Sequence, residues 1–271
     1  MIDAHLHIGH LGRGLENLIA HIDFHSIEKA VVLPLEDMER GANYSTEAAL
    51  DAVARYPDRI IPFCHVDPRS GEPLKRIEAY AKQGCRGFGE HKLRMDVDAP
   101  VMREIYSLCG ELGLPVLLHI EYGGAFNTNF PALEDMLKAY PKTIFIGHAQ
   151  AWWANISADA PLDNAYPKGK VEPGGFTDRL LTEYPNIYGD LSAGSGLNAL
   201  TRDKEFAKDF VERHRKKLLW ATDCPCRDGK GAGYEPGCFA AKSLPVLREL
   251  SDDQETFQDI THNNAAALFG V

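Results

Sequence analysis

The sequence has no excess of positive charge: 29 lysine and arginine residues stand against 39 aspartate and glutamate residues, for a net charge of −10. Proteins that bind a nucleic-acid backbone rely on lysine and arginine to neutralise phosphates, so this balance argues against nucleic acid as a partner. No apolar stretch approaches the roughly 18 residues of a membrane-spanning helix, so we expect no membrane insertion. The N-terminus lacks a charged segment followed by an apolar one, which predicts no secretory signal and a cytoplasmic location.

Cysteine is sparse, with six residues in a chain of 271. Four of them lie in or beside apolar segments, where small buried thiols are common, and without a secretory signal we expect all six to be reduced. Cys224-Pro225-Cys226 is a close pair that could serve redox chemistry or zinc binding. Because no second pair follows at zinc-finger spacing, the pattern favours ordinary buried thiols.

Hydrophobic residues make up 44% of the chain, enough for a large core. They gather in eight short runs rich in β-branched residues, at 2–8, 29–35, 60–67, 85–92, 114–120, 143–149, 186–192 and 218–224. Segments of helical period lie between them, for example 45–55, 73–83, 99–112, 131–140, 176–184 and 202–217, and 252–269 is helical in pattern at the end.

This alternation of strands and helices predicts parallel βαβ units, and eight units are the number that closes a (β/α)8 barrel. We therefore predict an α/β fold of the TIM-barrel class, as a single domain over residues 1–271. An open doubly wound sheet is the alternative. It usually carries a GxGxxG turn after its first strand, whereas residues 9–14 have their glycines in another order.

The connections between the predicted elements are of two kinds. Three helices end at Tyr-Pro pairs, Tyr56-Pro57, Tyr140-Pro141 and Tyr184-Pro185, because proline cannot continue a helix. The connections that follow strands are long, at 66–72, 93–99, 121–130, 150–175, 193–201 and 225–238. In a barrel these loops meet at the C-terminal end of the strands, where the binding site lies. Segment 150–175 is about four times as long as the usual connection and is a candidate lid.

Polar residues interrupt the apolar runs at this same end. His5 and His7 alternate on the first strand, so their side chains share a face and can reach one metal ion. Four more polar residues stand near the ends of other strands: Glu90, His119, His148 and Asp223. Each would be costly to bury without a partner, and a bound divalent metal would supply the partner for all of them.

Several segments together resemble the amidohydrolase superfamily of metal-dependent barrel enzymes. They are the strand-one motif at 3–7, the strand-five histidine in 115–119, His148 on strand six, the aspartate in 221–225 and the closing helix at 264–270. The likeness is closest to the amidohydrolase-2 type, which includes hydrolases and non-oxidative decarboxylases. Gly89-Glu90 departs from the Lys-x-His often found on strand four there, and is similar to the Gly-Glu of the two-metal TatD-type nucleases.

The resemblance implies a role for each of these residues. His5, His7, His119 and Asp223 would hold a divalent metal, and a nitrogen-rich set favours zinc. Asp223 would also move the proton of an activated water, and His148 would polarise the substrate carbonyl or bind a second metal. Glu90 would bridge two ions, or act as an acid, a base or a substrate ligand beside one ion, so one and two metals both stay open.

Two further residues are candidates for substrate binding. Lys92 shares the predicted face of Glu90 and could bind a substrate carboxylate; the alternative is a surface lysine with a buried stem. Trp152 lies beside Trp153 in the long segment 150–175 and could supply an apolar wall.

Together these features predict a hydrolase that uses metal-activated water on a small amide, ester or lactone. The alternative is a metal-dependent decarboxylase or hydratase of a small carboxylic acid on the same scaffold. A nuclease is disfavoured by the acidic charge. A non-catalytic barrel would be expected to have lost some of the ligands. The expected partner is a small molecule, and a homo-oligomer is compatible with the sequence.

Overall fold

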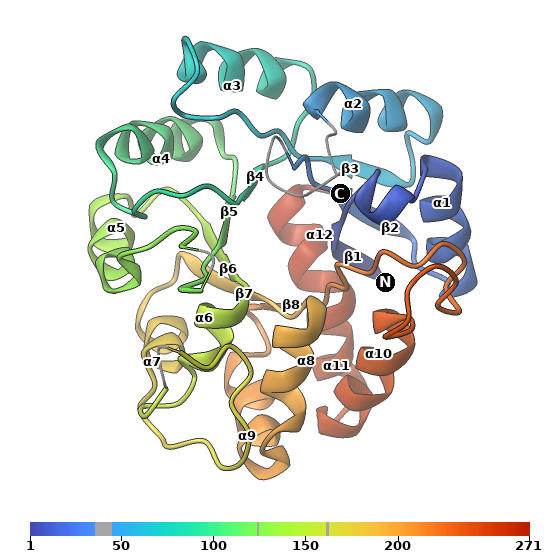
Figure 1. Cartoon of the computed structure of the whole chain (residues 1–271), viewed down its shortest axis with the longest axis vertical. Helices are drawn as coiled ribbons and strands as arrows, with labels where there is room; N and C mark the ends of the chain where they lie inside the picture. The colour runs from blue at the N-terminus through green and yellow to red at the C-terminus, as the bar shows by residue number, and fades with distance from the viewer. Residues whose placement is uncertain (36–44, 124, 161–162) are drawn as a thin grey trace.

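The computed structural model describes residues 1–35, 45–123, 125–160 and 163–271. In this part of the chain, eight short parallel strands lie at the centre and helices surround them (Figure 1). The strands are β1 (Ile2–Leu6), β2 (Lys29–Val32), β3 (Ile60–Pro62), β4 (Phe88–His91), β5 (Val116–His119), β6 (Phe145–His148), β7 (Ile187–Asp190) and β8 (Leu218–Leu219). Each lies within a predicted run, so the eightfold strand pattern is confirmed.

The strands form a closed barrel. Hydrogen bonds join β1-β2-β3 into one parallel sheet and β4-β5-β6-β7-β8 into another. A parallel bridge between Cys64 and Phe88 connects the two sheets on one side. On the other side the amide of Ala4 in β1 donates to the carbonyl of Trp220, just after β8, at 3.2 Å. These contacts confirm the TIM-barrel fold and exclude the open sheet.

Each predicted helical segment contains a helix, and further helices lie outside these segments. The helices are α1 (Leu15–Phe24), α2 (Thr46–Arg55), α3 (Pro73–Lys82), α4 (Pro100–Leu112), α5 (Leu133–Ala139), α6 (Gln150–Ala154), α7 (Phe176–Glu183), α8 (Ala193–Thr201), α9 (Lys204–His214), α10 (Phe239–Leu250), α11 (Gln254–Gln258) and α12 (Asn264–Phe269). The residues that cap α2, α5 and α7 at their C-terminal ends are Tyr56, Tyr140 and Tyr184, each followed by proline as predicted.

Two predicted connections contain helices. Residues 193–201, expected to be a loop, form α8, and α6 lies at the start of segment 150–175. The helical pattern of α8 is weak in the sequence, because its glycines lower the helix propensity. Packing explains why residue 196 is glycine: a Cβ there would lie 2.2 Å from the carbonyl oxygen of Leu191, so the helix starts too close to β7 for any larger side chain. Residues 161 and 162 of the long segment lie outside the described residues.

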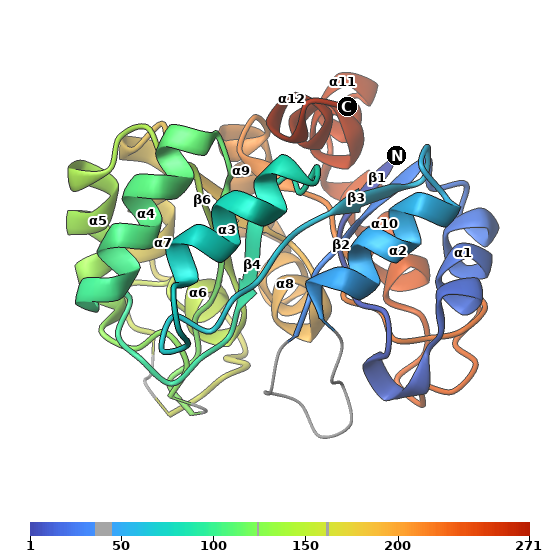
Figure 2. The ribbon, with the colours of Figure 1, turned by 90° about the horizontal axis from the view of Figure 1, so that it is seen from above.

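The barrel interior is closed at the end where the strands begin. Figure 2 shows α11 and α12 on the side of the N-terminus, opposite α6. Ala265 and Phe269 of α12 are buried among inward-facing residues of β1, β2 and β3, and the rings of Phe269 and Phe63 meet at 5.4 Å. The opposite end, where the strands finish, is therefore the expected place of the binding site.

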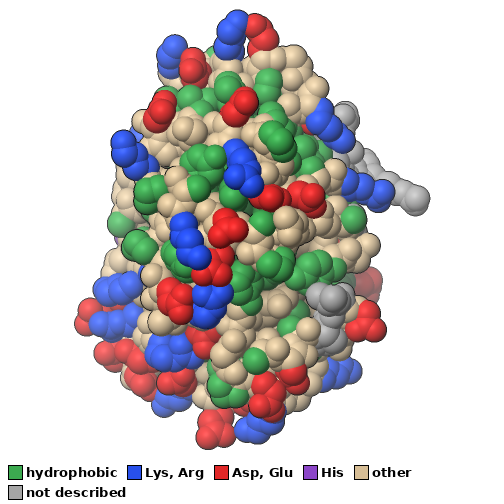
Figure 3. All heavy atoms as spheres, turned by 90° about the vertical axis from the view of Figure 1, so that its left-hand side faces the viewer, with side chains coloured by type: hydrophobic (Ala, Val, Ile, Leu, Met, Phe, Trp, Pro, Cys, Tyr) green, Lys and Arg blue, Asp and Glu red, His purple; other side chains and the backbone are tan. Residues whose placement is uncertain are grey.

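The outer surface is mixed in charge. Figure 3 shows lysine and arginine side chains interspersed with aspartate and glutamate over the face formed by α3, α4, α5 and α7. Ion pairs account for part of this pattern, such as Arg179 with Glu134 at 2.7 Å. Within the described ranges, every helix is too short or too polar to cross a membrane.

Candidate metal centre

His5 and His7 are held in place by their Nδ1 atoms. His5 lies on β1 and His7 directly follows it, and both side chains are buried. Nδ1 of His5 is 2.6 Å from a carboxylate oxygen of Asp190 on β7, and Nδ1 of His7 is 2.9 Å from the carbonyl oxygen of Leu33. Since both partners are acceptors, each Nδ1 carries a proton, and Nε2 is the ring atom of each histidine that is left to face the site.

The two Nε2 atoms face each other at 2.9 Å. Two lone pairs at this distance repel unless a positive charge lies between or beside them. Burial lowers the pKa of His5, but Asp190 and then Asp223 outweigh it and raise the pKa well above its usual value. The surroundings of this nitrogen pair therefore favour a cation, either a proton or a metal ion.

Asp223 brings a carboxylate to the same point. It follows β8, and its amide donates to the carbonyl of His5 at 2.8 Å, which fixes the loop over β1. Oδ1 lies 3.4 Å from Nε2 of His7 and 4.0 Å from Nε2 of His5. This oxygen is buried and accepts no hydrogen bond from the described residues. A buried carboxylate oxygen without a donor is costly, so the site fits a metal ion held by His5, His7 and Asp223.

Glu90 occupies the middle of the group. One carboxylate oxygen lies 3.2 Å from Nε2 of His7 and 3.6 Å from Nε2 of His5. The other lies 2.6 Å from Nδ1 of His119 and 3.6 Å from Nε2 of His148. Burial raises the pKa of the Glu90 carboxyl, yet the histidines, His119 above all, hold it well below its usual range. Glu90 is therefore an ionised carboxylate that spans two groups of histidines.

His148 and His119 are neighbours on β6 and β5, where the register pairs them directly. Nδ1 of His148 contacts Oγ of Ser192 at 3.0 Å, and burial lowers the pKa of His148 to about 4, so its ring is neutral. His148 lies close enough to His5 and Glu90 for these three residues to hold an ion.

His119 differs, because both of its nitrogens contact carboxylates, Glu90 at 2.6 Å and Glu121 at 3.2 Å. It belongs neither to this group nor to the group of His5, His7 and Asp223.

A cavity of about 290 Å³ opens over these residues. Its lining includes His119, His148 and Asp223 from the strand ends, with Lys92, His10 and Gln150 beside them. Tyr166 and Tyr234 line it from segment 150–175 and from the loop after β8. Lys92 thus reaches the predicted site, and the long segment contributes a wall to it.

Trp152 does not reach the cavity, so its predicted place as an apolar wall is wrong. Its side chain is fully buried, with its ring 5.9 Å from that of Phe130. A Cβ on Gly147 would lie 2.3 Å from the indole, so this glycine leaves the space that Trp152 fills beneath α6. The residue that faces the cavity from the start of α6 is Gln150.

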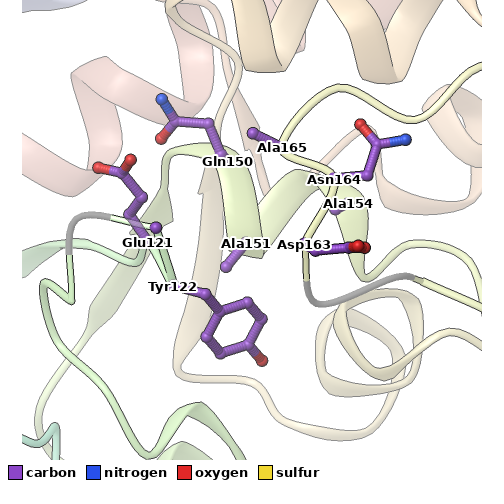
Figure 4. Close-up of a pocket in the computed structure, with 9 residues that line it drawn as sticks. Glu121, Tyr122, Gln150, Ala151, Ala154, Asp163, Asn164 and Ala165 are labelled. Atoms are coloured by element: carbon purple, nitrogen blue, oxygen red, sulfur yellow. The ribbon is translucent and has the colours of Figure 1, made fainter.

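A smaller hollow of about 80 Å³ adjoins the cavity and shares Gln150 with it. Figure 4 shows Glu121 and Tyr122 on one side of this hollow and Asp163 and Asn164 on the other. Its volume admits a few waters but no ring-sized substrate.

Asp190, Ser192 and His10 were not among the predicted site residues. Asp190 ends β7 and orients His5, and Ser192 contacts His148. His10 follows β1, lines the cavity and lies 3.8 Å from Asp223. The sequence did contain a signal for Asp190, because it is a carboxylate near the end of the seventh apolar run. The predicted site residues were identified by the same position on other runs.

Comparison with known proteins identifies the family of the chain and confirms its fold. A family model described as Amidohydrolase matches residues 2–271. No curated protein sequence matches the chain significantly. An uncharacterised TIM-barrel protein from Bordetella bronchiseptica has a similar structure, with 16% identity, a TM-score of 0.73, and coverage of 100% of this chain and 98% of that one.

Two further solved structures share the fold. A probable 2-pyrone-4,6-dicarboxylic acid hydrolase from Acinetobacter baumannii, with citric acid bound, has 15% identity and a TM-score of 0.67, and the match covers 100% of this chain and 99% of that one. A dihydroxybenzoic acid decarboxylase from a Polaromonas species, with bound manganese and an inhibitor, has 15% identity and a TM-score of 0.58, with 99% and 96% covered.

Proposed function

The chain belongs to the amidohydrolase family, and from this premise we propose that it is a metal-dependent hydrolase of a small carboxylated amide, ester or lactone. The observation that carries the proposal is the convergence below a cavity of the His5 and His7 Nε2 atoms with Oδ1 of Asp223, a buried oxygen that accepts no hydrogen bond from the described residues.

His5, His7 and Asp223 would hold the ion, with Glu90 beside them. Histidine nitrogens favour zinc, whereas carboxylate oxygens also suit manganese, which one similar decarboxylase contains. We propose zinc as the first candidate. A divalent ion there would supply Lewis acidity and lower the pKa of a water to about 7. Glu90 and His148 could hold a second ion, as the Gly-Glu sequence of strand four suggests.

Asp223 is suited to move the proton. Burial raises the pKa of its carboxyl, but His5, His7 and His10 outweigh burial and lower it, so the group is ionised at neutral pH. It borders the cavity, where it can take a proton from water and return it to the leaving group. His148 also borders the cavity as a neutral ring, and we propose that it contacts the substrate carbonyl.

The cavity suits a small anionic substrate. Lys92 brings a positive charge to its lining, and two tyrosines, Tyr166 and Tyr234, add hydroxyl groups and ring faces. The names of the two functionally described neighbours both refer to carboxylic acids on a six-membered ring. We therefore propose a substrate that carries a carboxylate for Lys92 in addition to the bond that is cleaved.

Decarboxylation is a second candidate, favoured by the similarity to the manganese-bound decarboxylase. In that reaction the substrate carboxylate leaves as CO₂ and a proton replaces it on carbon; Asp223 would first take this proton from water and then donate it. Both neighbours share the fold with this chain at 15% identity, so their names support the two reactions about equally, and product analysis distinguishes them.

The two reactions release different products. Metal-loaded protein is incubated with carboxylated lactones and esters, and separately with hydroxybenzoic acids, while released acid and CO₂ are measured. Acid release from the first set without CO₂ is expected, and Asp223→Asn is the inactive control. CO₂ from the second set alone would select the decarboxylase. No turnover of either set by fully loaded protein would count against the proposal.

A further inference from the structure

A second cluster of metal-binding side chains lies next to the candidate metal centre but outside it. Cys224, Cys226 and Cys238 belong to the loop between β8 and α10, and His21 belongs to α1. All four side chains are buried. One ligand atom from each lies within 4.8 Å of the others. Two segments from opposite ends of the chain thus bring three thiols and an imidazole to one point.

The spacing fits a tetrahedral ion. Zinc–sulfur bonds of about 2.3 Å place the ligand atoms of a tetrahedron about 3.8 Å apart. Sγ of Cys224 and Sγ of Cys238 are 3.9 Å apart. Nδ1 of His21 lies 3.2 Å from Sγ of Cys226, so a small outward shift of that ring would complete the shell. All six cysteines of the chain are free, and these three are not joined as disulfides.

Hydrogen-bond donors are directed at the sulfur atoms of the cluster, as they are at metal-bound thiolates. The amide of Phe239 donates to Sγ of Cys224 at 3.3 Å. Nε2 of His25, which caps the C-terminal end of α1, lies 3.2 Å from Sγ of Cys238 and 2.9 Å from the carbonyl oxygen of Gly229. Donors directed at sulfur stabilise thiolates, the form that binds metal.

We propose that His21, Cys224, Cys226 and Cys238 bind a structural zinc ion, distinct from the candidate metal centre. Four protein ligands fill a tetrahedral shell and leave no position for substrate, which is the composition of structural rather than catalytic zinc sites. The ion would join α1 to the loop after β8. Cys224 follows Asp223 directly, and Pro225, Tyr234 and Phe239 of the same loop region line the cavity. The zinc would therefore position the cavity wall and Asp223.

Cobalt spectroscopy tests this proposal separately from catalysis, because cobalt bound by thiolates absorbs through charge transfer from sulfur and the candidate metal centre has no cysteine ligand. Wild-type protein is produced in cobalt-supplemented medium and kept reduced. We expect thiolate charge-transfer bands at one equivalent per chain. Cys226→Ser should lose most of this absorption, whereas Cys109→Ser, which changes a buried thiol on α4, and His25→Ala, which changes the ring beside the cluster, should retain it.

A second measurement does not depend on variants that fold. X-ray absorption at the zinc edge of wild-type protein should show sulfur neighbours at about 2.3 Å. Cobalt-loaded wild type without thiolate bands, or zinc-loaded wild type with only nitrogen and oxygen neighbours, would overturn the proposal. Retention of the bands in Cys226→Ser at wild-type intensity would also exclude this ligand set.

Discussion

Asp190 on β7 accepts a hydrogen bond from Nδ1 of His5 on β1 at 2.6 Å. The same carboxylate oxygen lies 3.5 Å from Nδ1 of His148, and the other oxygen accepts the amide of Ser192 at 2.8 Å. One buried carboxylate thus directs Nε2 of His5 toward His7 and also neighbours the ring of His148. Partners of this kind fix the tautomer and orientation of metal-binding histidines.

Asp190→Asn should therefore weaken metal binding at the candidate metal centre by about 10–100-fold. Asp178→Asn is the matched control, because Asp178 on α7 also accepts from a histidine, His214, at 2.6 Å, but in the outer helices. Competition against a chelator measures both affinities. Equal affinity in wild type and both variants would show that Asp190 does not orient a ligand.

Asp223→Asn should keep the fold and lose about 10²–10⁴-fold in kcat, the usual contribution of a general acid or base. The amide oxygen can still contact a metal ion, but the group cannot carry the proton. Turnover is measured at matched metal content, with circular dichroism as the check on folding. Near-wild-type kcat in a folded, loaded variant would remove Asp223 from proton transfer.

Lys92→Met should raise KM for a carboxylated substrate by about 10–100-fold, since a hydrogen bond to a charged group contributes about 1.5–3 kcal/mol. Methionine retains most of the apolar stem and removes the charge. Lys138→Met is the control: Lys138 pairs with Glu134 at 3.0 Å on the outside of α5 and should leave KM unchanged. If KM is the same in all three proteins, the carboxylate lies elsewhere.

The number of ions depends on Glu90, whose two oxygens face His5 and His7 on one side and His148 on the other. If Glu90 bridges two ions, Glu90→Ala should bind one equivalent less than wild type in a titration of chelated protein. The difference between the two proteins is the relevant quantity, because an ion at the cysteine cluster contributes equally to both. No difference, with full activity in wild type at that stoichiometry, supports a single ion.

The fold was predictable because its signals are local. Each strand is a short apolar run, and the Tyr-Pro pairs mark helix ends through the fixed geometry of proline. Helix α8 was missed because Gly194 and Gly196 weaken its propensity, and the reason for Gly196, close contact with Leu191, exists only in the folded chain. Trp152 was misplaced for a similar reason, since no local pattern shows that Gly147 leaves room for its ring.

The candidate site was predictable in part. Residues such as His5 and Asp223 interrupt apolar runs, and that signal is readable along the chain. The contact of Asp190 with His5 depends on barrel closure. The cysteine cluster shows the limit most clearly: Cys224-Pro225-Cys226 had no partner pair nearby, and the structure supplies Cys238 together with His21 from the far end of the sequence.

The central claim is that a metal ion lies between His5, His7 and Asp223, and anomalous diffraction from crystals of an active preparation tests it most directly. Data are collected on both sides of the absorption edges of zinc and manganese, which also identifies the ion. The account predicts an anomalous peak about 2.0–2.2 Å from the two Nε2 atoms and from a carboxylate oxygen of Asp223, if the ion is zinc. An active preparation whose crystals show no anomalous peak among these three residues would contradict it.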